Sequence, residues 1–117
     1  LERCARVRDC RLRHQGNFIA PQPAAGELHA WHLYPLRVLG GRRREVFDAM
    51  RADGVGVQVN YIPVYWHPLY AAQGYQRGMC PVAEEYYEQE ISLPLFPDLL
   101  DSDVDRVIEL VRGFLGG

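Results

Sequence analysis

Residues 28–62 read L-H-A-W-H-L-Y-P-L-R-V-L-G-G-R-R-R-E-V-F-D-A-M-R-A-D-G-V-G-V-Q-V-N-Y-I, and this stretch decides the class of fold that we expect. Its first part, Leu28 to Val38, is rich in aromatic and branched side chains and predicts a strand. Arg42 to Asp53 spaces apolar residues three and four positions apart, which predicts a helix that ends at Gly54. Val55 to Ile62 alternates valines with glycine and polar residues, so it is the clearest strand prediction in the chain.

A strand, a helix and a strand in succession favour an α/β domain. If the two strands are parallel, their connection should cross over in the right-handed sense. Pro35 has no N–H to donate to a sheet, so we expect the first strand to lie at an edge or to carry a bulge at that residue.

The flanking segments add helices to this core. Leu1 to His14 predicts a helix, and Asn17 to Glu27 predicts a loop because prolines and Gly26 interrupt it. Further along the chain we expect a loop with one short helical turn at 63–79, a helix over Val82 to Glu90 with Pro81 as its first residue, a short strand at Ile91 to Phe96 limited by Pro94, and a last helix capped by Asp101 or Ser102. The apolar stripe of that last helix contains Val104, Val107, Ile108, Val111 and Leu115, and Gly116 follows it. These elements predict a two-layer α/β domain, in which helices pack on a short sheet.

Composition describes one soluble domain. The chain has 117 residues, of which 48% are hydrophobic and 24% charged, and its formal net charge is −2. This charge gives no bulk attraction to nucleic acid or to an anionic membrane. The odd set of Cys4, Cys10 and Cys80 lacks a paired spacing, which favours free thiols and a cytoplasmic location. Because the chain has no initiator Met, no secretion signal and no membrane span, we expect an excised piece of a cytoplasmic protein.

Three chemical readings of the polar residues are weak. His14, His29, His32 and His67 show no metal-ligand spacing, and His29 and His32 would point to opposite faces of a strand, so no metal site is expected. A basic first helix with Arg42 to Arg44 leaves an arginine-dependent nucleic-acid binder as a lesser alternative, since no reader motif accompanies it. Ser92 and Ser102 have no neighbouring base that would make either a nucleophile.

The segment Asn60 to Tyr70, N-Y-I-P-V-Y-W-H-P-L-Y, is the unusual one. It collects tyrosines, a tryptophan, a histidine and an asparagine directly after a predicted strand, where ligand-contacting groups often gather. An aromatic cluster that merely packs the loop onto the core would have the same composition. Composition alone leaves both readings open.

Three motifs resemble one protein family. They are G-V-G-V-Q-V-N-Y-I-P-V-Y-W-H-P-L-Y at 54–70, C-P-V-A-E at 80–84 and I-S-L-P-L-F-P at 91–97, and they resemble the C-terminal domain of the DegT/DnrJ sugar aminotransferases in both order and spacing. The Trp31 to Arg37 stretch and the last helix are similar to that family too. Many members carry histidine at the positions of Asn60 and Tyr65. The motif N-Y-I-P-V-Y-W-H-P at 60–68 is most similar to that of the branch that aminates a UDP-linked 4-keto-6-deoxy sugar toward pseudaminic acid.

This resemblance implies a fold-type I enzyme, usually a homodimer, that depends on pyridoxal phosphate (PLP). Its large N-terminal domain would supply the cofactor, the lysine that forms an imine with it and most phosphate contacts. All thirteen basic residues of this chain are arginines. Residues 1–117 are therefore expected to be a C-terminal small domain that binds no cofactor and is inactive alone, with the catalytic large domain absent.

The resemblance also implies a role in shaping the pocket for the UDP-sugar. We expect Tyr65, Asn60 and Tyr61 to bind it, with His67 and Tyr70 as further candidates, because phenol and amide groups can hydrogen-bond sugar hydroxyls and an acetamido group. Asn60 and Tyr61 would point to opposite faces if the strand continues, so one of the two is expected to be structural. The amino donor would be an amino acid, glutamate being common in the family. The alternative is a free-standing module that binds a nucleotide sugar, or mediates association, without chemistry.

Overall fold

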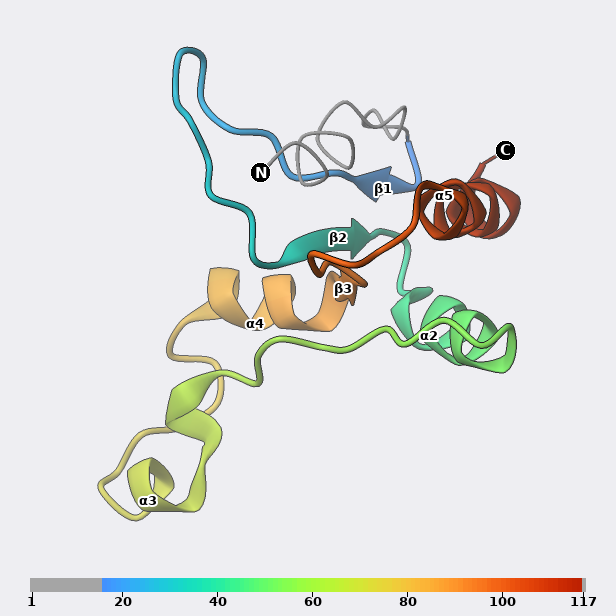
Figure 1. Cartoon of the computed structure of the whole chain (residues 1–117). Helices are drawn as coiled ribbons and strands as arrows, with labels where there is room; N and C mark the ends of the chain where they lie inside the picture. Colours follow the sequence, from blue (N-terminus) through green and yellow to red (C-terminus); the bar gives the residue numbers. More distant parts are fainter. Residues whose placement is uncertain (1–15, 117) are drawn as a thin grey trace.

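A computed structural model describes residues 16–116 of the chain, so the predicted helix Leu1 to His14 lies outside the described residues. The elements run in the order β1 (Phe18–Ile19), β2 (Tyr34–Val38), α2 (Arg43–Ala52), the 3-10 turn η1 (Val64–Trp66), α3 (Pro68–Ala71), α4 (Pro81–Gln89), β3 (Glu90–Leu93) and α5 (Asp101–Leu115). Figure 1 shows α3 projecting away from the sheet, at the opposite end of the molecule from α5.

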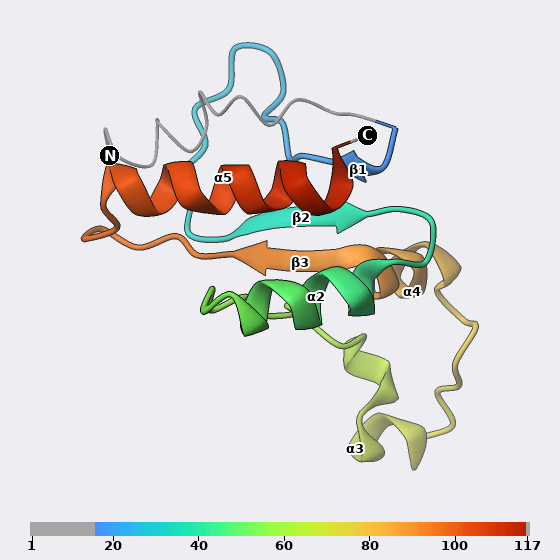
Figure 2. The ribbon, with the colours of Figure 1, turned by 90° about the vertical axis from the view of Figure 1, so that its right-hand side faces the viewer.

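The three strands form one antiparallel sheet in the order β1-β2-β3. Along β2 the buried residues alternate, so that Tyr34, Leu36 and Val38 face the core. Figure 2 shows α2 and α5 lying in front of the strands, and their apolar residues, such as Met50 and Val111, join this core. The predicted two-layer α/β arrangement, with helices packed on a short sheet, is confirmed.

The first predicted strand is shorter and differently placed than expected. Only Tyr34–Val38 of the predicted range 28–38 is a strand, while Leu28 is 92% exposed in a projecting loop. β2 is the central strand of the sheet, so the edge position predicted from Pro35 is wrong. Pro35 is tolerated because β1 pairs only with Arg37 and Val38, which leaves the β1 side of β2 without a strand partner at the proline.

The strand predicted at Val55 to Ile62 is absent except for an isolated bridge between Gln58 and Ser92. Burial does alternate at first, with Val55 and Val57 inside. The backbone groups, however, have other partners, because the Val55 N–H donates to the Met50 carbonyl at 3.0 Å. Without a second strand in this segment there is no parallel pair and no right-handed crossover.

A strand also forms where a loop was predicted. Phe18 and Ile19 pair with the end of β2, and the Leu39 N–H donates to the Asn17 carbonyl at 2.9 Å. The Asn17 side chain donates to the Leu115 carbonyl at 3.0 Å, which ties β1 to the end of α5. The rest of the predicted loop, 20–27, contains no strand or helix.

The helix predictions hold with small changes at the ends. α2 and α4 match their predicted ranges, with Pro81 as the first residue of α4, and η1 with α3 supplies short helical turns in the loop after residue 62. β3 begins one residue earlier than the predicted strand Ile91 to Phe96 and ends at Leu93, directly before Pro94, so the predicted residues 94–96 are not part of it. The cap of α5 is Leu100 and not Asp101 or Ser102, because the Asp103 carboxylate accepts the Leu100 N–H at 3.3 Å. None of the helices within 16–116 is long and apolar enough to cross a membrane.

Candidate functional site

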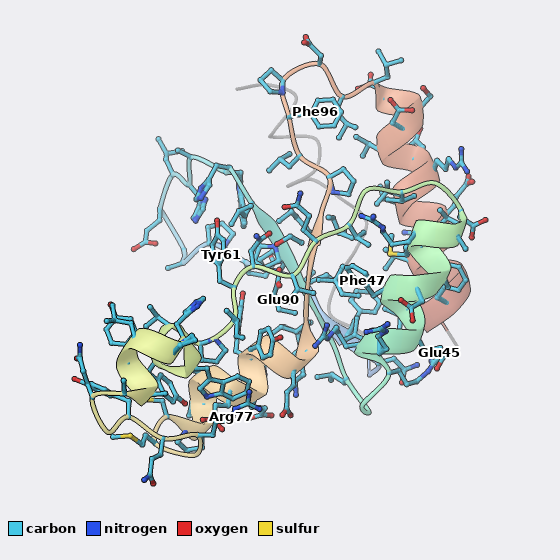
Figure 3. All side chains as sticks on the ribbon, turned by 90° about the horizontal axis from the view of Figure 1, so that it is seen from below. Glu45, Phe47, Tyr61, Arg77, Glu90 and Phe96 are labelled. Carbon is cyan, nitrogen blue, oxygen red and sulfur yellow. The ribbon has the colours of Figure 1, made fainter. Side chains whose placement is uncertain are left out.

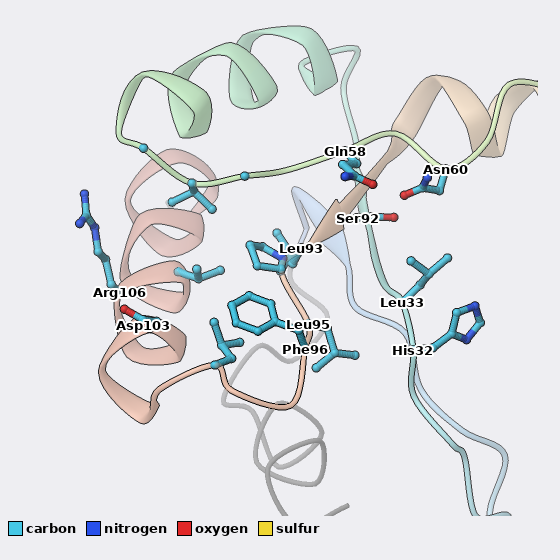
Figure 4. Close-up of a pocket in the computed structure, with 16 residues that line it drawn as sticks. His32, Leu33, Gln58, Asn60, Ser92, Leu93, Leu95, Phe96, Asp103 and Arg106 are labelled. Atoms are coloured by element: carbon cyan, nitrogen blue, oxygen red, sulfur yellow. The ribbon is translucent and has the colours of Figure 1, made fainter.

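A cleft of about 420 Å³ lies between the extended segment 54–60, the end of β3 and the start of α5. Figure 4 shows polar side chains at both of its ends, Gln58, Asn60 and Ser92 at one and Asp103 and Arg106 at the other, with apolar side chains between them. The cleft therefore offers hydrogen-bonding groups around an apolar surface, which is the usual composition of a small-molecule site.

A shallower depression lies on the other side of Asn60. Its lining residues come from the start of the aromatic loop and from the start of α4, namely Asn60, Tyr61, Pro63, Cys80, Pro81, Val82, Ala83 and Tyr86. Asn60 is thus shared by the cleft and the depression. Tyr61 lines only the depression, with 71% of its surface exposed.

Asn60 is held through its backbone, while its side-chain oxygen is unpartnered. Its N–H donates to Glu90 Oε2 at 2.7 Å. Its Oδ1 is buried and accepts no hydrogen bond from the residues at 16–116. The expected opposition of Asn60 and Tyr61 assumed a continuing strand, which the structure lacks at these residues. The Asn60 backbone is anchored to Glu90, and Tyr61 is largely in solvent.

Glu90 is a buried acidic residue that the sequence did not single out. It is fully buried on β3, and Ser92 Oγ donates to its Oε1 at 2.5 Å. Burial raises the pKa of Glu90, while the bonds from Ser92 and Asn60 and the nearby charge of Arg43 oppose that rise. In the sequence Glu90 belongs to the strand-like run E-I-S-L, and nothing in that run indicates that its side chain is buried and hydrogen-bonded.

Tyr65 is anchored within the chain. It is 9% exposed, and its hydroxyl donates a short hydrogen bond to Glu84 Oε1 and accepts the Cys80 N–H at 3.3 Å. The same Glu84 oxygen accepts Trp66 Nε1 at 3.2 Å and the Gly78 N–H at 2.5 Å. We call Tyr65, Trp66, Gly78 and Glu84 the loop anchor.

The loop anchor shifts the ionisation of both its acidic groups. The hydrogen bond from Tyr65, followed by that from Gly78, lowers the pKa of Glu84. Burial first, and then the bond to Glu84, raises the pKa of Tyr65. Glu84 is therefore a carboxylate at neutral pH and Tyr65 a neutral phenol, which suits a fixed structural contact. Glu84 belongs to the C-P-V-A-E motif, so a signal for it was present.

The remaining predicted site residues lie farther along the loop. His67 is exposed immediately before α3, and Tyr70 packs its ring edge-on against Tyr75, with centroids 6.0 Å apart. Neither residue lines the cleft or the depression. The structure thus brings Asn60 and Tyr61 together at the depression, holds Tyr65 in the loop anchor, and leaves His67 and Tyr70 apart.

Metal chemistry finds no support in the part of the chain that is described, where no group of histidine, cysteine and acidic residues is arranged to hold an ion. The His29 ring stacks on Trp31 with centroids 4.1 Å apart. His14, Cys4 and Cys10 lie outside the described residues.

Curated relatives match most of this chain but only part of their own length. The spore coat polysaccharide biosynthesis protein SpsC of Bacillus subtilis is 44% identical over 95 residues, which are 76% of this chain and 24% of SpsC. A UDP-N-acetyl-3-dehydro-alpha-D-glucosamine 3-aminotransferase of Acidithiobacillus ferrooxidans is 32% identical over 83% of this chain and 26% of that enzyme. The chain spans about a quarter of the length of these relatives.

Solved structures share the fold. PseC of Helicobacter pylori, an aminotransferase involved in the biosynthesis of pseudaminic acid, superposes on 97% of this chain with a TM-score of 0.82 and 25% identity, over 31% of its own length. The fold is therefore the small α/β domain of the fold-type I aminotransferases. The family described as DegT/DnrJ/EryC1/StrS aminotransferases matches residues 4–112, and the chain belongs to this family.

Proposed function

We propose that this chain is the C-terminal small domain of a longer PLP-dependent aminotransferase that moves an amino group from an amino acid, glutamate being the expected donor, to a UDP-linked 4-keto-6-deoxy sugar. The observation that carries the proposal is the family match over 4–112, in a chain that spans only a quarter of its curated relatives. The fold shared with PseC and the N-Y-I-P-V-Y-W-H-P wording at 60–68 support a 4-keto substrate of the pseudaminic acid type.

Members of this family in general use PLP, but the residues of this chain do not fit a resident site for it. The chain has no lysine that could form an imine with the cofactor. Among the described arginines, Arg37 donates to Gln89, Arg51 to the Val57 carbonyl and Arg106 to the Asp53 carbonyl, so these three guanidinium groups already have acceptors within the chain. We therefore assign the cofactor to the large domain of the longer protein, and to this chain a part of the sugar site.

The contribution of this chain is to bind and orient the sugar. The Asn60 amide carries both a donor and an acceptor, and it borders both hollows in the surface. Tyr61 adds an exposed phenol beside it. Tyr65, which is held in the loop anchor, and His67 and Tyr70 stay predicted contacts of the sugar.

The first experiment compares PLP binding and turnover by the 117-residue chain with those of the complete protein. The purified 117-residue chain, incubated with PLP, should show no absorbance band beyond that of the free cofactor and no glutamate-dependent conversion of a nucleotide keto sugar. The complete protein that contains this sequence should show both. Covalent PLP on the 117-residue chain, or turnover by it alone, would refute the proposal.

The second experiment tests the substrate. The complete protein should aminate a UDP-linked 4-keto-6-deoxy sugar in preference to the 3-keto sugar named for the Acidithiobacillus relative. A preference for the 3-keto sugar would overturn the 4-keto assignment and keep the family activity. If no large domain adjoins this sequence in its gene and the chain binds a UDP-sugar alone, the free-standing module replaces the enzyme.

A further inference from the structure

We propose that Glu90 is a positioning residue of the sugar site, which holds the Asn60 backbone so that the Asn60 amide can recognise a hydrogen-bonding substituent of the sugar, an acetamido group above all. The inference rests on the proposed function, because it assigns a specific role within that same site. It concerns a fully buried carboxyl group that does not line the cleft itself but accepts hydrogen bonds from two residues that do, Asn60 and Ser92.

Both oxygens of the Glu90 carboxyl are committed. Oε2 accepts the Asn60 N–H at 2.7 Å, and Oε1 accepts Ser92 Oγ at 2.5 Å. Ser92 is 5% exposed on the same strand, so it fixes the carboxyl from within the sheet. Figure 3 shows Glu90 on β3 next to the segment that leads to Tyr61.

A second contact fixes the segment two residues earlier. The Gln58 N–H donates to the Ser92 carbonyl at 3.2 Å, and the Ser92 N–H donates to the Gln58 carbonyl at 2.8 Å. Beyond this bridge regular pairing stops, and the side-chain carboxyl of Glu90 takes the place of a further strand partner for Asn60. The backbone of residues 58–60 is thus fixed to β3 at two points.

The result is a fixed backbone that carries a side-chain oxygen without a partner. Asn60 Oδ1 is buried and accepts nothing from the described residues, although buried polar atoms are normally hydrogen-bonded. Figure 4 shows Asn60 and Ser92 at the same end of the cleft, on different segments. Asn60 lines the cleft with its backbone held by Glu90, and its unpaired Oδ1 lacks a donor, which the N–H of an acetamido group would supply.

The test uses the complete aminotransferase and five variants. Glu90→Met keeps the length of the side chain and removes the acceptor, while Glu90→Gln keeps an acceptor for the Asn60 N–H. Glu88→Met is the matched control, because Glu88 is exposed on α4 two residues away. Asn60→Ala, alone and combined with Glu90→Met, shows whether Glu90 acts through Asn60.

We expect Glu90→Met to raise the KM for the keto sugar about 5- to 10-fold while the KM for glutamate stays within about 2-fold, as the loss of one buried hydrogen bond implies. Glu90→Gln should restore the sugar KM to within about 2-fold of the natural protein, and Glu88→Met should change neither KM. Asn60→Ala should raise the sugar KM, and adding Glu90→Met to it should raise it little further.

An unchanged sugar KM in Glu90→Met, an equal rise of both KM values, or additive effects in the double variant would overturn the positioning role. Should Glu90→Met fail to fold, Ser92→Ala replaces it, with an expected rise of the sugar KM of about 2- to 5-fold and no change for glutamate. An unchanged sugar KM in Ser92→Ala would then overturn the role. If the unmodified protein aminates no nucleotide keto sugar, the proposed function itself fails.

Discussion

Replacing Gly54 with alanine tests whether the turn after α2 requires a left-handed residue. Gly54 has φ +79°. Its N–H donates to the Arg51 carbonyl at 3.1 Å, and the Val55 N–H donates to the Met50 carbonyl at 3.0 Å. This pair of bonds is the Schellman motif, in which a glycine in the left-handed region ends a helix. The motif directs the chain from α2 into the wall of the cleft.

The expected cost comes from the backbone alone. A Cβ on Gly54 would meet nothing within 4 Å, so no clash contributes. A residue other than glycine loses about 1–2 kcal/mol in the left-handed region, and restricting the unfolded chain returns only about 0.4–1 kcal/mol. Gly54→Ala should therefore lower the free energy of unfolding by about 1 kcal/mol.

Gly56 supplies the matched control two residues away. It lines the same cleft, a Cβ there would also meet nothing within 4 Å, and its φ lies outside the left-handed region. Gly56→Ala should raise the free energy of unfolding by about 0.4–1 kcal/mol. The two substitutions are the same chemical change at neighbouring positions and are expected to have opposite signs.

Urea unfolding of the purified chain, followed by tryptophan fluorescence, measures both changes as shifts of the midpoint at constant m-value. In thermal unfolding, Gly54→Ala should lower Tm by roughly 4 °C. Equal shifts in the two variants, or a Gly54→Ala midpoint at or above that of the natural chain, would refute the assignment of the turn.

Two further predictions concern the loop anchor. Tyr65→Phe in the complete enzyme removes the hydroxyl that bonds to Glu84 and should raise the KM for sugar about 3- to 10-fold, with little change for glutamate; an unchanged sugar response removes Tyr65 from the site. The bonds from Tyr65 and Gly78 lower the pKa of Glu84 in the folded chain, so ionised Glu84 stabilises the loop anchor at neutral pH. This stabilisation is lost as the pH falls through the pKa of Glu84 in the folded chain, which lies below the ordinary glutamate range. The fluorescence of Trp66, whose indole bonds to Glu84, should report this acid transition; Glu84→Gln should abolish it and Glu88→Gln should leave it in place.

The helices of this fold were predictable and the strands only partly so, for a physical reason. A helix such as α5 pairs its own backbone groups, so its apolar stripe is sufficient to locate it. A strand needs a partner from elsewhere in the chain. Phe18–Ile19 becomes a strand because the end of β2 pairs with it. Val55 to Ile62 does not become one because only Gln58 pairs with β3, while the Val55 N–H bonds to α2 and the Asn60 N–H to the Glu90 side chain.

The candidate site divides along the same line. Its aromatic loop and Glu84 lie in motifs that the sequence displays, so they could be found without a structure. Glu90 could not, because its importance depends on which backbone group approaches it across 30 positions of sequence. A buried carboxyl next to a strand bridge has no signature in residue spacing.

Glu84 and Glu90 differ in whether their carboxyl groups must be ionised to hold their hydrogen-bond donors. Glu84 offers a single oxygen to three donors, and a neutral amide oxygen with two lone pairs cannot satisfy all of them. Glu90 gives each oxygen one donor, and Ser92 Oγ can reverse its role and accept from a glutamine N–H. Glutamine should therefore replace Glu90 with little loss and fail at Glu84. This difference agrees with the opposite directions of their pKa shifts, raised at the buried Glu90 and lowered at Glu84. Position within the fold, rather than residue type, thus decides which of the two glutamates must be ionised to hold its partners.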